Sequence, residues 1–383
     1  MTIFNSLGSN YTFRFVLHAL FTRNKKHYTN KLIEYLEKKY QGKAHLLYKA
    51  RNAITVALHI LRLPKNSFIA INGFTCYAVY EAIIKAGHKP YYLDIDEDLN
   101  FSARTLEQAL LKNTPIRAVI IQNTLGIPCD IEKISALCKK YQCFLMEDLA
   151  HSAGTVYNNG QKAGTVGDCT ILSFGMDKII DSVSGGALII RMKIPTYSYT
   201  LEKVPFKQQI KDRLYPLFTF LIRKSYFFLL GKIIHTILKN LCLLNTPMES
   251  LSEKSLPALP SWQCHLTYEQ LTQLENNLQH RRTIATIYSE KINPFLQSKK
   301  IIGRIPQSTN LRFPAFTKRR ENLIAYLRQN NVYISDIWYD DAPIQCPKAE
   351  KIAHRIINLP THQALSEKQA LHIALLINRW VTS

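Results

Sequence analysis

One aspartate and one lysine, thirty residues apart, carry the clearest chemical signal in this sequence of 383 residues. Asp148 follows a short apolar run, and Ser173 and Lys178 lie at the end of a second run, which is followed by a Gly-Gly pair at 185–186 and a third run. A lysine amine can form an imine with pyridoxal phosphate, and a carboxylate can keep the pyridine nitrogen of that cofactor protonated. This arrangement predicts a pyridoxal phosphate site with Lys178 and Asp148 as its catalytic pair.

A lysine that attacks a carbonyl group must be a neutral amine. We expect Lys178 to lie in a site closed by apolar strands and lined by Lys49 and Arg51, because burial and nearby positive charge both lower the pKa of an amine. The neutral amine can then also carry a proton between the carbon of the amino donor and the cofactor.

Short apolar runs alternate with amphipathic stretches through the first half of the chain, which predicts strands alternating with helices. The expected strands are 68–71, 90–94, 118–122, 144–146 and 187–190, and the expected helices are 30–40, 51–63, 74–86, 105–111 and 131–141. This order is typical of an α/β protein whose mixed, mostly parallel sheet is flanked by helices, with ligands at the carboxyl ends of the strands. Asp148 lies at one such end.

The last third of the chain has a different pattern, which predicts a smaller α+β domain. Its expected elements are a long helix over 266–292, strands over 310–313 and 332–334 around a helix over 319–329, and a last helix over 367–380. We therefore expect an amino-terminal helical arm over 1–40, a large cofactor-binding domain over 41–200, a basic helical insertion with its linker over 201–255, and a small domain over 256–383.

The insertion stands out by its charge and by its apolar faces. Residues 204–245 hold seven Lys and Arg and one Asp, and so contribute +6 to the net charge of +21. In the second half of this segment Lys232, His235 and Lys239 recur on one helix face, and Leu and Ile fill the others. Such a helix suits the surface of an anionic membrane. A hairpin packed on protein is the alternative, and it stays open.

The composition limits the cellular compartments and the kinds of binding partner that we expect for this protein. The eight Cys are scattered without a CxxC pair, so neither a metal site nor a disulfide framework is predicted, and reduced thiols fit a cytoplasmic protein. The first apolar stretch is short and is interrupted by Arg14 and His18, so it does not read as a secretory signal. The basic composition favours phosphate-bearing partners. No nucleic-acid partner is expected, because the known binding motifs are missing.

The order of motifs along the chain resembles the sugar aminotransferases of the DegT/DnrJ/EryC1/StrS family. The matching motifs are FTCYAVYEAI (74–83), YYLDIDED (91–98), GIPCDIEKI (126–134), EDLAHSAG (147–154), SFGMDK (173–178), GGALII (185–190), QLENNLQHRRTIATIY (273–288) and RIINLPTHQALSE (355–367). The resemblance implies the type I fold of pyridoxal-phosphate-dependent transferases and a homodimer. It also implies transamination of a nucleotide-linked keto sugar, with L-glutamate as donor, for a surface polysaccharide such as lipopolysaccharide.

The resemblance also assigns roles to single residues. Lys178 matches the Schiff-base lysine, Asp148 the partner of the pyridine nitrogen, and Ser173 a hydroxyl that contacts the cofactor phosphate. His151 occupies a position beside the cofactor ring. Either Cys76 or Tyr77 falls where a side chain covers the ring face.

The chain departs from the family pattern at the phosphate and on the substrate side. Ala50, Arg51 and Asn52 stand where the family has a Ser-Gly-Thr loop, so helix N–H groups and the Arg51 guanidinium are expected to contact the phosphate. In many members an asparagine contacts the cofactor phosphate of the neighbouring subunit, and this asparagine has no clear match in 256–266. The 204–245 insertion is also not typical of the family.

Two other functions stay open at this point. A sugar dehydratase on the same scaffold is disfavoured, because the resemblance implies that such relatives replace the Schiff-base lysine with histidine, whereas this chain has Lys178. A non-catalytic, membrane-associated relative that binds the cofactor or a sugar and acts in regulation is compatible with the altered phosphate loop and the basic insertion.

Overall fold

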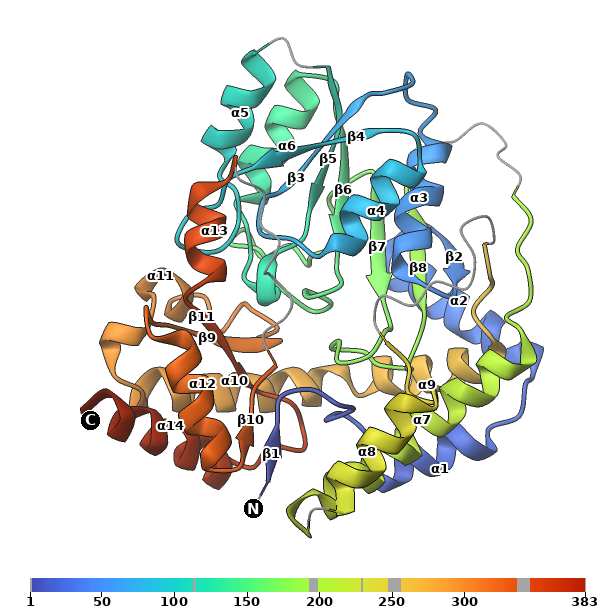
Figure 1. Ribbon diagram of the computed structural model, residues 1–383. Coiled ribbons are helices and arrows are strands. Elements are labelled where there is room, and N and C mark those ends of the chain that lie inside the picture. Colours follow the sequence, from blue (N-terminus) through green and yellow to red (C-terminus); the bar gives the residue numbers. More distant parts are fainter. Residues whose placement is uncertain are drawn as a thin grey trace.

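The computed structural model describes residues 2–112, 115–192, 199–228, 230–246, 256–335 and 345–382. Within these residues the largest sheet has seven strands (Figure 1). Along the chain these are β2 (Lys43–Leu47), β3 (Phe68–Asn72), β4 (Lys89–Leu93), β5 (Ile116–Ile121), β6 (Phe144–Asp148), β7 (Cys169–Ser173) and β8 (Gly186–Ile190). Their order in space is β2-β8-β7-β6-β5-β3-β4, and β8 runs in the opposite direction to the other six strands. The predicted mixed, mostly parallel sheet is confirmed.

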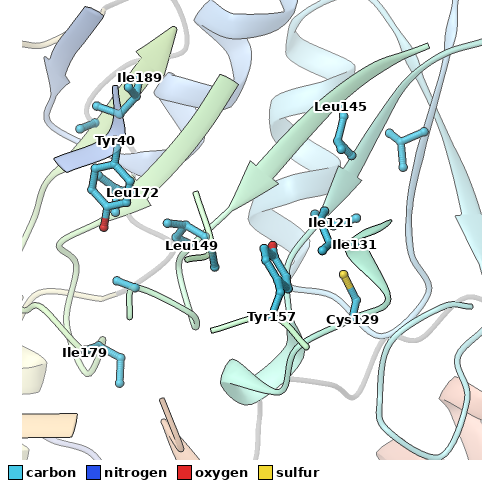
Figure 2. Close-up of a cluster of buried hydrophobic side chains, with 14 of the residues drawn as sticks. Tyr40, Ile121, Cys129, Ile131, Leu145, Leu149, Tyr157, Leu172, Ile179 and Ile189 are labelled. Atoms are coloured by element: carbon cyan, nitrogen blue, oxygen red, sulfur yellow. The ribbon is translucent and has the colours of Figure 1, made fainter. Parts of the chain in front are cut away.

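Helices cover both faces of this sheet, because successive strand residues point to opposite sides and both sides are apolar. One face packs against α2 (Lys26–Tyr40), α5 (Ala103–Leu111) and α6 (Ile131–Lys140), with Val119 and Leu145 in the shared core. Part of that core, including Leu145, Leu149 and Tyr157, is drawn in Figure 2. The other face packs against α3 (Ala50–Ile60) and α4 (Tyr77–Lys85).

A second core lies in the carboxyl-terminal part of the chain. The elements of this part of the chain are α10 (Leu274–Lys291), α11 (Lys299–Ile302), β9 (Arg312–Phe316), α12 (Arg320–Gln329), β10 (Val332–Tyr333), α13 (Pro347–Ala353), β11 (Ile356–Pro360) and α14 (Glu367–Thr382). β9 and β11 pair antiparallel. β1 (Ile3–Phe4) pairs with β10, so the segment predicted as a purely helical arm begins with a strand that joins the opposite end of the chain.

Several predicted elements have different bounds in the structure. The helix predicted from 74 begins at Tyr77, because the Asn72 carboxamide accepts the N–H of Phe74 at 2.9 Å and closes a turn. The long helix predicted over 266–292 is divided at Gln273 into α9 (Ser261–Thr272) and α10, without a glycine or proline to mark the break. The strand predicted from Asn310 begins at Arg312, because Asn310 has a φ of 49°.

The insertion folds as a helical hairpin. α7 (Phe206–Ser225) and α8 (Leu230–Asn240) are joined by a short turn, Tyr226–Phe228, and α1 (Phe13–Phe21) packs along α7 (Figure 1). Most of the predicted linker, 247–255, lies outside the described residues. The residues directly after it are attached to the sheet edge, since the carbonyl of Pro257 accepts the N–H of Tyr48 at 2.8 Å. No helix among the described residues is long and apolar enough to cross a membrane.

Candidate active site

Lys178 lies on the loop that joins β7 to β8, at the edge of the sheet where β6 also ends. Burial lowers the pKa of Lys178, and the nearby Arg312 guanidinium acts in the same direction, whereas Cys76, Asp148 and Asp177 partly offset the change. The lowered pKa agrees with the neutral amine that the chemistry requires. The positive charge that helps to lower the pKa of Lys178 belongs to Arg312 at the start of β9, whereas the prediction assigned this effect to Lys49 and Arg51.

Asp148 ends β6 and is buried, with 4% of its surface exposed. Its carboxylate accepts the N–H of Ala150 at 2.9 Å. Burial raises the pKa of Asp148, and the Ala150 N–H and the Lys178 charge work against that rise. A buried carboxylate with few donors gains most from a cationic partner, such as a protonated pyridine nitrogen. The position and environment of Asp148 therefore fit pyridoxal phosphate.

His151 is held in one orientation by two segments from elsewhere in the chain. Its Nδ1 accepts the N–H of Leu125 at 3.3 Å, and its carbonyl accepts the Thr309 hydroxyl at 2.6 Å. Burial lowers the pKa of His151 well below its usual value, and the charges of Lys178 and Arg312 add to this effect. The ring is therefore neutral, and because Nδ1 accepts, its proton lies on Nε2, which can donate.

The predicted phosphate site gathers residues from β7, β8 and α3. Ser173 lies opposite Gly186 in the β7–β8 pairing, and its hydroxyl oxygen accepts the N–H of Gly175 at 3.5 Å. A side chain at Gly186 would come within 2.7 Å of the Ala50 backbone, so glycine permits the start of α3 to approach the strand. Asn52 is buried in the first turn of α3. Ser173 and the amino terminus of α3 are thus brought to one place.

Arg51 lies differently from the prediction. Its guanidinium forms an ion pair with Glu81 on α4 at 2.5 Å, and only 9% of its side chain is exposed. An arginine committed to a carboxylate is less available as a phosphate clamp, so the backbone of Ala50, Arg51 and Asn52 becomes the more suitable phosphate contact.

Cys76 and Tyr77, the two candidates for the ring face, stand at the start of α4, where both are exposed. Cys76 lies close enough to Lys178 to affect the pKa of the amine. The Tyr77 ring lies 5.3 Å from the Tyr80 ring, centroid to centroid. Of the two, Cys76 is therefore the one that the structure places beside the lysine.

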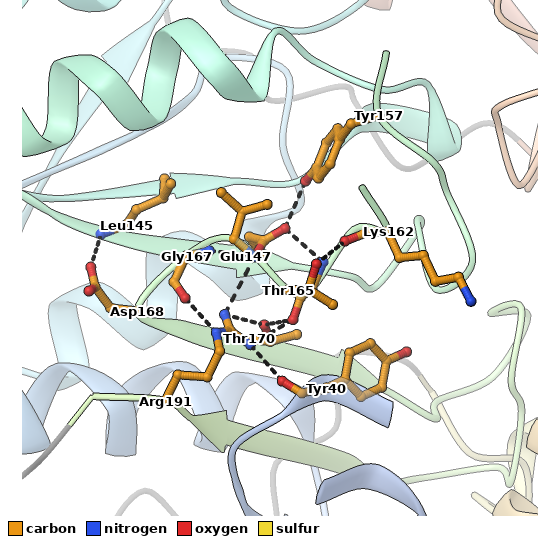
Figure 3. Close-up of polar contacts among 12 residues, drawn as sticks. Tyr40, Leu145, Glu147, Tyr157, Lys162, Thr165, Gly167, Asp168, Thr170 and Arg191 are labelled. Carbon is orange, nitrogen blue, oxygen red and sulfur yellow. Dashed lines mark hydrogen bonds and ion pairs between the residues drawn. The ribbon is translucent and has the colours of Figure 1, made fainter. Parts of the chain in front are cut away.

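Glu147, next to Asp148, points to the opposite face of the sheet and has a structural role (Figure 3). Its carboxylate accepts the Tyr157 hydroxyl and three backbone N–H groups, those of Gly164, Val166 and Gly167, at 2.7 to 2.8 Å. Arg191 adds an ion pair at 3.5 Å. The Glu147 carboxylate is thus occupied by the 164–167 loop, Tyr157 and Arg191, so Asp148 is the acid of the pair that faces the candidate site.

The comparisons with known proteins match the chain on both sides of the α7–α8 hairpin. The sequence model of the DegT/DnrJ/EryC1/StrS aminotransferase family matches residues 21–195 and 258–377. A UDP-4-amino-4,6-dideoxy-N-acetyl-beta-L-altrosamine transaminase of Campylobacter jejuni is 25% identical over 83% of this chain and 81% of its own. A GDP-perosamine synthase of Escherichia coli O157:H7 is 26% identical over 91% of this chain and 90% of its own.

Solved structures show the same fold. Helicobacter pylori PseC, described as an aminotransferase involved in the biosynthesis of pseudoaminic acid, superposes with a TM-score of 0.67, covering 95% of this chain and 94% of its own at 19% identity. The predicted fold class is confirmed, as is the prediction of a pyridoxal-phosphate-dependent aminotransferase. Because the family model matches well over half of the sequence, this chain belongs to the DegT/DnrJ/EryC1/StrS aminotransferase family.

Proposed function

We propose that this chain moves an amino group from L-glutamate to the carbonyl of a keto sugar carried on a nucleoside diphosphate, in the synthesis of a surface polysaccharide. The observation that carries the proposal is that Lys178, after β7, and the buried Asp148, at the end of β6, lie at the same edge of the sheet in this fold. The names of the relatives above supply the substrate class. A net charge of +21 suits a substrate that carries a diphosphate.

Each predicted site residue has a task that its surroundings support. Lys178 would hold the cofactor aldehyde, Asp148 its ring nitrogen, and Ser173 with the first turn of α3 its phosphate, while the neutral His151 would donate from Nε2 beside the ring. When bound, pyridoxal phosphate supplies an electron sink for the carbon that loses its proton. The Lys178 Nζ, once released, would accept that proton and deliver it to the former aldehyde carbon of the cofactor, on the other side of the amino nitrogen.

The experiment that tests this function is absorbance spectroscopy of the purified protein with added pyridoxal phosphate, before and after L-glutamate. We expect a band in the visible range that needs Lys178 and that glutamate converts to the pyridoxamine form. A band that ignores glutamate would favour another donor or the dehydratase chemistry. No band at any cofactor concentration would contradict the enzyme and leave the regulatory relative as the better function.

We further propose that the hairpin of α7 and α8 binds the inner face of an anionic membrane, so that a cytoplasmic enzyme works beside glycan assembly. Gly231 is the one buried residue among the described residues of α8. Three apolar residues of α8 share one face at helical spacing and are each more than half exposed: Leu230, Ile233 and Ile237. Phe227 and Phe228 extend this surface at the turn, with exposures of 62% and 76%.

Charge favours lipid over protein as the occupant of this surface. The one acidic residue of the hairpin, Asp212, is buried and accepts the Tyr48 hydroxyl at 2.7 Å, so the outer surface carries only positive charge. Lys224, Lys232 and Lys239 are exposed on the hairpin, and Lys232 and Lys239 lie on a different face of α8 from its apolar residues. α1 extends the apolar surface with Phe13 and Phe21, which are 60% and 73% exposed. A helix with exposed apolar side chains on one face and lysines on another suits the acyl boundary and the headgroups of an anionic leaflet.

The membrane proposal is tested by the binding of Phe227→Ser/Phe228→Ser protein to vesicles with and without phosphatidylserine. Deletion of 204–245 is a poorer test, because it would remove the buried bond between Asp212 and Tyr48. The matched control is Leu371→Ser/Leu375→Ser, which removes two exposed leucines from α14. We expect the hairpin variant alone to lose binding. Equal binding of both variants would contradict the proposal.

We also propose a homodimer, as the family resemblance implies. α4, which carries Cys76 at its start, exposes Tyr77 and Ile84 at 55% and 47%, and apolar groups of this size beside a site suit a subunit contact. Sedimentation velocity tests this directly. If the Phe227→Ser/Phe228→Ser variant dissociates into monomers, the hairpin serves the dimer and the membrane proposal is wrong.

A further inference from the structure

The lysine loop, residues 174–185, is held by a segment that lies outside the part of the chain matched by the family. The match begins at residue 21. Asn10 and Tyr11, ahead of that point, both bond to the lysine loop. We call these two residues the amino-terminal clamp. Both residues lie outside the range that the family model matches.

Asn10 fixes the backbone of the lysine itself. Its Nδ2 donates to the carbonyl of Lys178 at 3.1 Å and to the Asp181 carboxylate at 3.3 Å. Its Oδ1 accepts from the guanidinium of Arg281 at 3.3 Å. Because Arg281 can only donate, the amide of Asn10 is held with its nitrogen toward the loop. Arg281 is fully buried and also donates to Thr361 at 3.1 Å, so the clamp is anchored in the carboxyl-terminal part.

Asp181 links the clamp to both sides of Lys178. Its carboxylate accepts the N–H of Asp177 at 2.7 Å, the N–H of Val183 at 2.9 Å and the hydroxyl of Tyr11 at 2.8 Å. Asp177 and Val183 have φ values of 62° and 72°, a region that such side chains rarely adopt. Backbone in this region persists where surrounding contacts hold it, and these hydrogen bonds are such contacts.

The insertion supports the same clamp from the other side. Arg223 on α7 donates to the carbonyl of Tyr11 at 2.8 Å. Residue 223 also lies outside the two matched ranges. Two segments outside the matched ranges, residues 10–11 and α7, thus meet next to the lysine loop.

We propose that Asn10 is a positioning residue for Lys178, which it serves by holding the lysine carbonyl and the Asp181 carboxylate and so setting where the lysine amine lies relative to Asp148. This inference rests on the proposed role of Lys178. A loop released from the clamp would let the amine move, and a displacement of about 1 Å at a reacting group costs up to about 100-fold in rate.

The test compares Asn10→Ala with Asn5→Ala by hydrogen–deuterium exchange of the 175–183 peptide in protein prepared without cofactor. Asn5 is the matched control, because its Nδ2 donates to the Asn358 carbonyl at 3.0 Å and its Oδ1 accepts the Ser335 N–H at 3.0 Å, which fastens the same segment elsewhere. We expect exchange of the peptide to accelerate about tenfold or more in Asn10→Ala and to stay unchanged in Asn5→Ala.

A second variant and a second readout separate positioning from folding. Asn10→Asp keeps an oxygen for Arg281 but removes the donor, so it should loosen the loop at least as much as Asn10→Ala. In the cofactor-loaded protein, kcat should fall about tenfold with the KM for glutamate nearly unchanged, and the pH titration of the cofactor absorbance should shift. Equal exchange in the Asn5 and Asn10 variants, or an Asn10→Asp variant like the wild type, would overturn the proposal. The exchange result stands even if no cofactor binds.

Discussion

The lysine site and the α7–α8 hairpin depart in opposite ways from the usual division of polar and apolar groups. At the site, Lys178 lies among Asp148, Asp177 and Arg312, all three of which are buried. On the hairpin, Ile233 and Ile237 are more than half exposed. Buried charge costs free energy and so does exposed apolar surface, and each is retained where a partner compensates for it. The comparison teaches that the first region fits a charged small molecule and the second an apolar surface.

The largest expected effect comes from removing the lysine amine. Lys178→Ala should lower transamination by about 1,000-fold or more and abolish the visible band of added pyridoxal phosphate, because the covalent partner and the proton carrier are lost together. Steady-state rates with L-glutamate and the absorbance spectrum measure this. The control is Lys133→Ala, which removes an exposed lysine on α6. A variant that kept the band would exclude Lys178 as the partner.

Asp148 and Glu147 are adjacent carboxylates for which we expect different roles, the first in catalysis and the second in stabilising the fold. Asp148→Asn should lower kcat about 100-fold while leaving the cofactor-free protein as stable as the wild type or more so, since burial raises the pKa of Asp148. Glu147→Gln should instead lower the free energy of unfolding by about 2 kcal/mol, because four donors lose part of their acceptor. Urea unfolding and steady-state rates of both variants measure the two effects, and the reverse assignment would refute this division of roles.

The charges of the hairpin should tune membrane binding without affecting catalysis. Lys232→Glu/Lys239→Glu should weaken binding to phosphatidylserine vesicles about tenfold or more at low salt, because each lysine near an anionic surface contributes about 1 kcal/mol. Its rate with a water-soluble substrate should equal that of the wild type. Sedimentation with vesicles over a range of salt concentrations measures the effect. Binding that is independent of both charge and salt would argue for a purely apolar contact.

The smallest expected effect concerns pH and the lysine loop. Burial, with the neighbouring Asp177, raises the pKa of Asp181 to about 7, and Tyr11 is the other titratable side chain bonded to it. An unfolded aspartate ionises near pH 4, so the stabilising contribution of Asp181 is fully present below about pH 4 and is lost as pH rises through about 7. Relative to Asp181→Asn, the wild type should lose on the order of 1 kcal/mol between pH 5 and pH 6. Parallel urea midpoints across this range would contradict the raised pKa.

Local patterns predicted most of the fold and the centre of the site. Apolar runs of strand length and the residues directly after them located β6, β7, Asp148 and Lys178, because a strand and its end are adjacent in sequence. The division of the long helix at Gln273 was missed, since neither a glycine nor a proline marks it. The roles of the single site residues stay predictions until the experiments above are made.

The residue types around the site were visible in the sequence, but their pairing was not. Arg51 was expected at the phosphate, yet Glu81, thirty residues later, takes its guanidinium. Arg312 was not expected near Lys178 at all. Both results depend on distances between segments that only the folded chain brings together.

The sequence by itself determined that this chain forms a mixed, mostly parallel sheet and carries a lysine and an aspartate at neighbouring strand ends. Side-chain alternation and strand length are local properties, so they can be read along the chain. The tertiary structure alone decided that Asn10 reaches the carbonyl of Lys178 across 168 residues. It also decided which charges set the pKa of the lysine. Hydrogen bonds and electrostatic effects depend on distance in space and on burial, and neither is encoded by spacing along the chain.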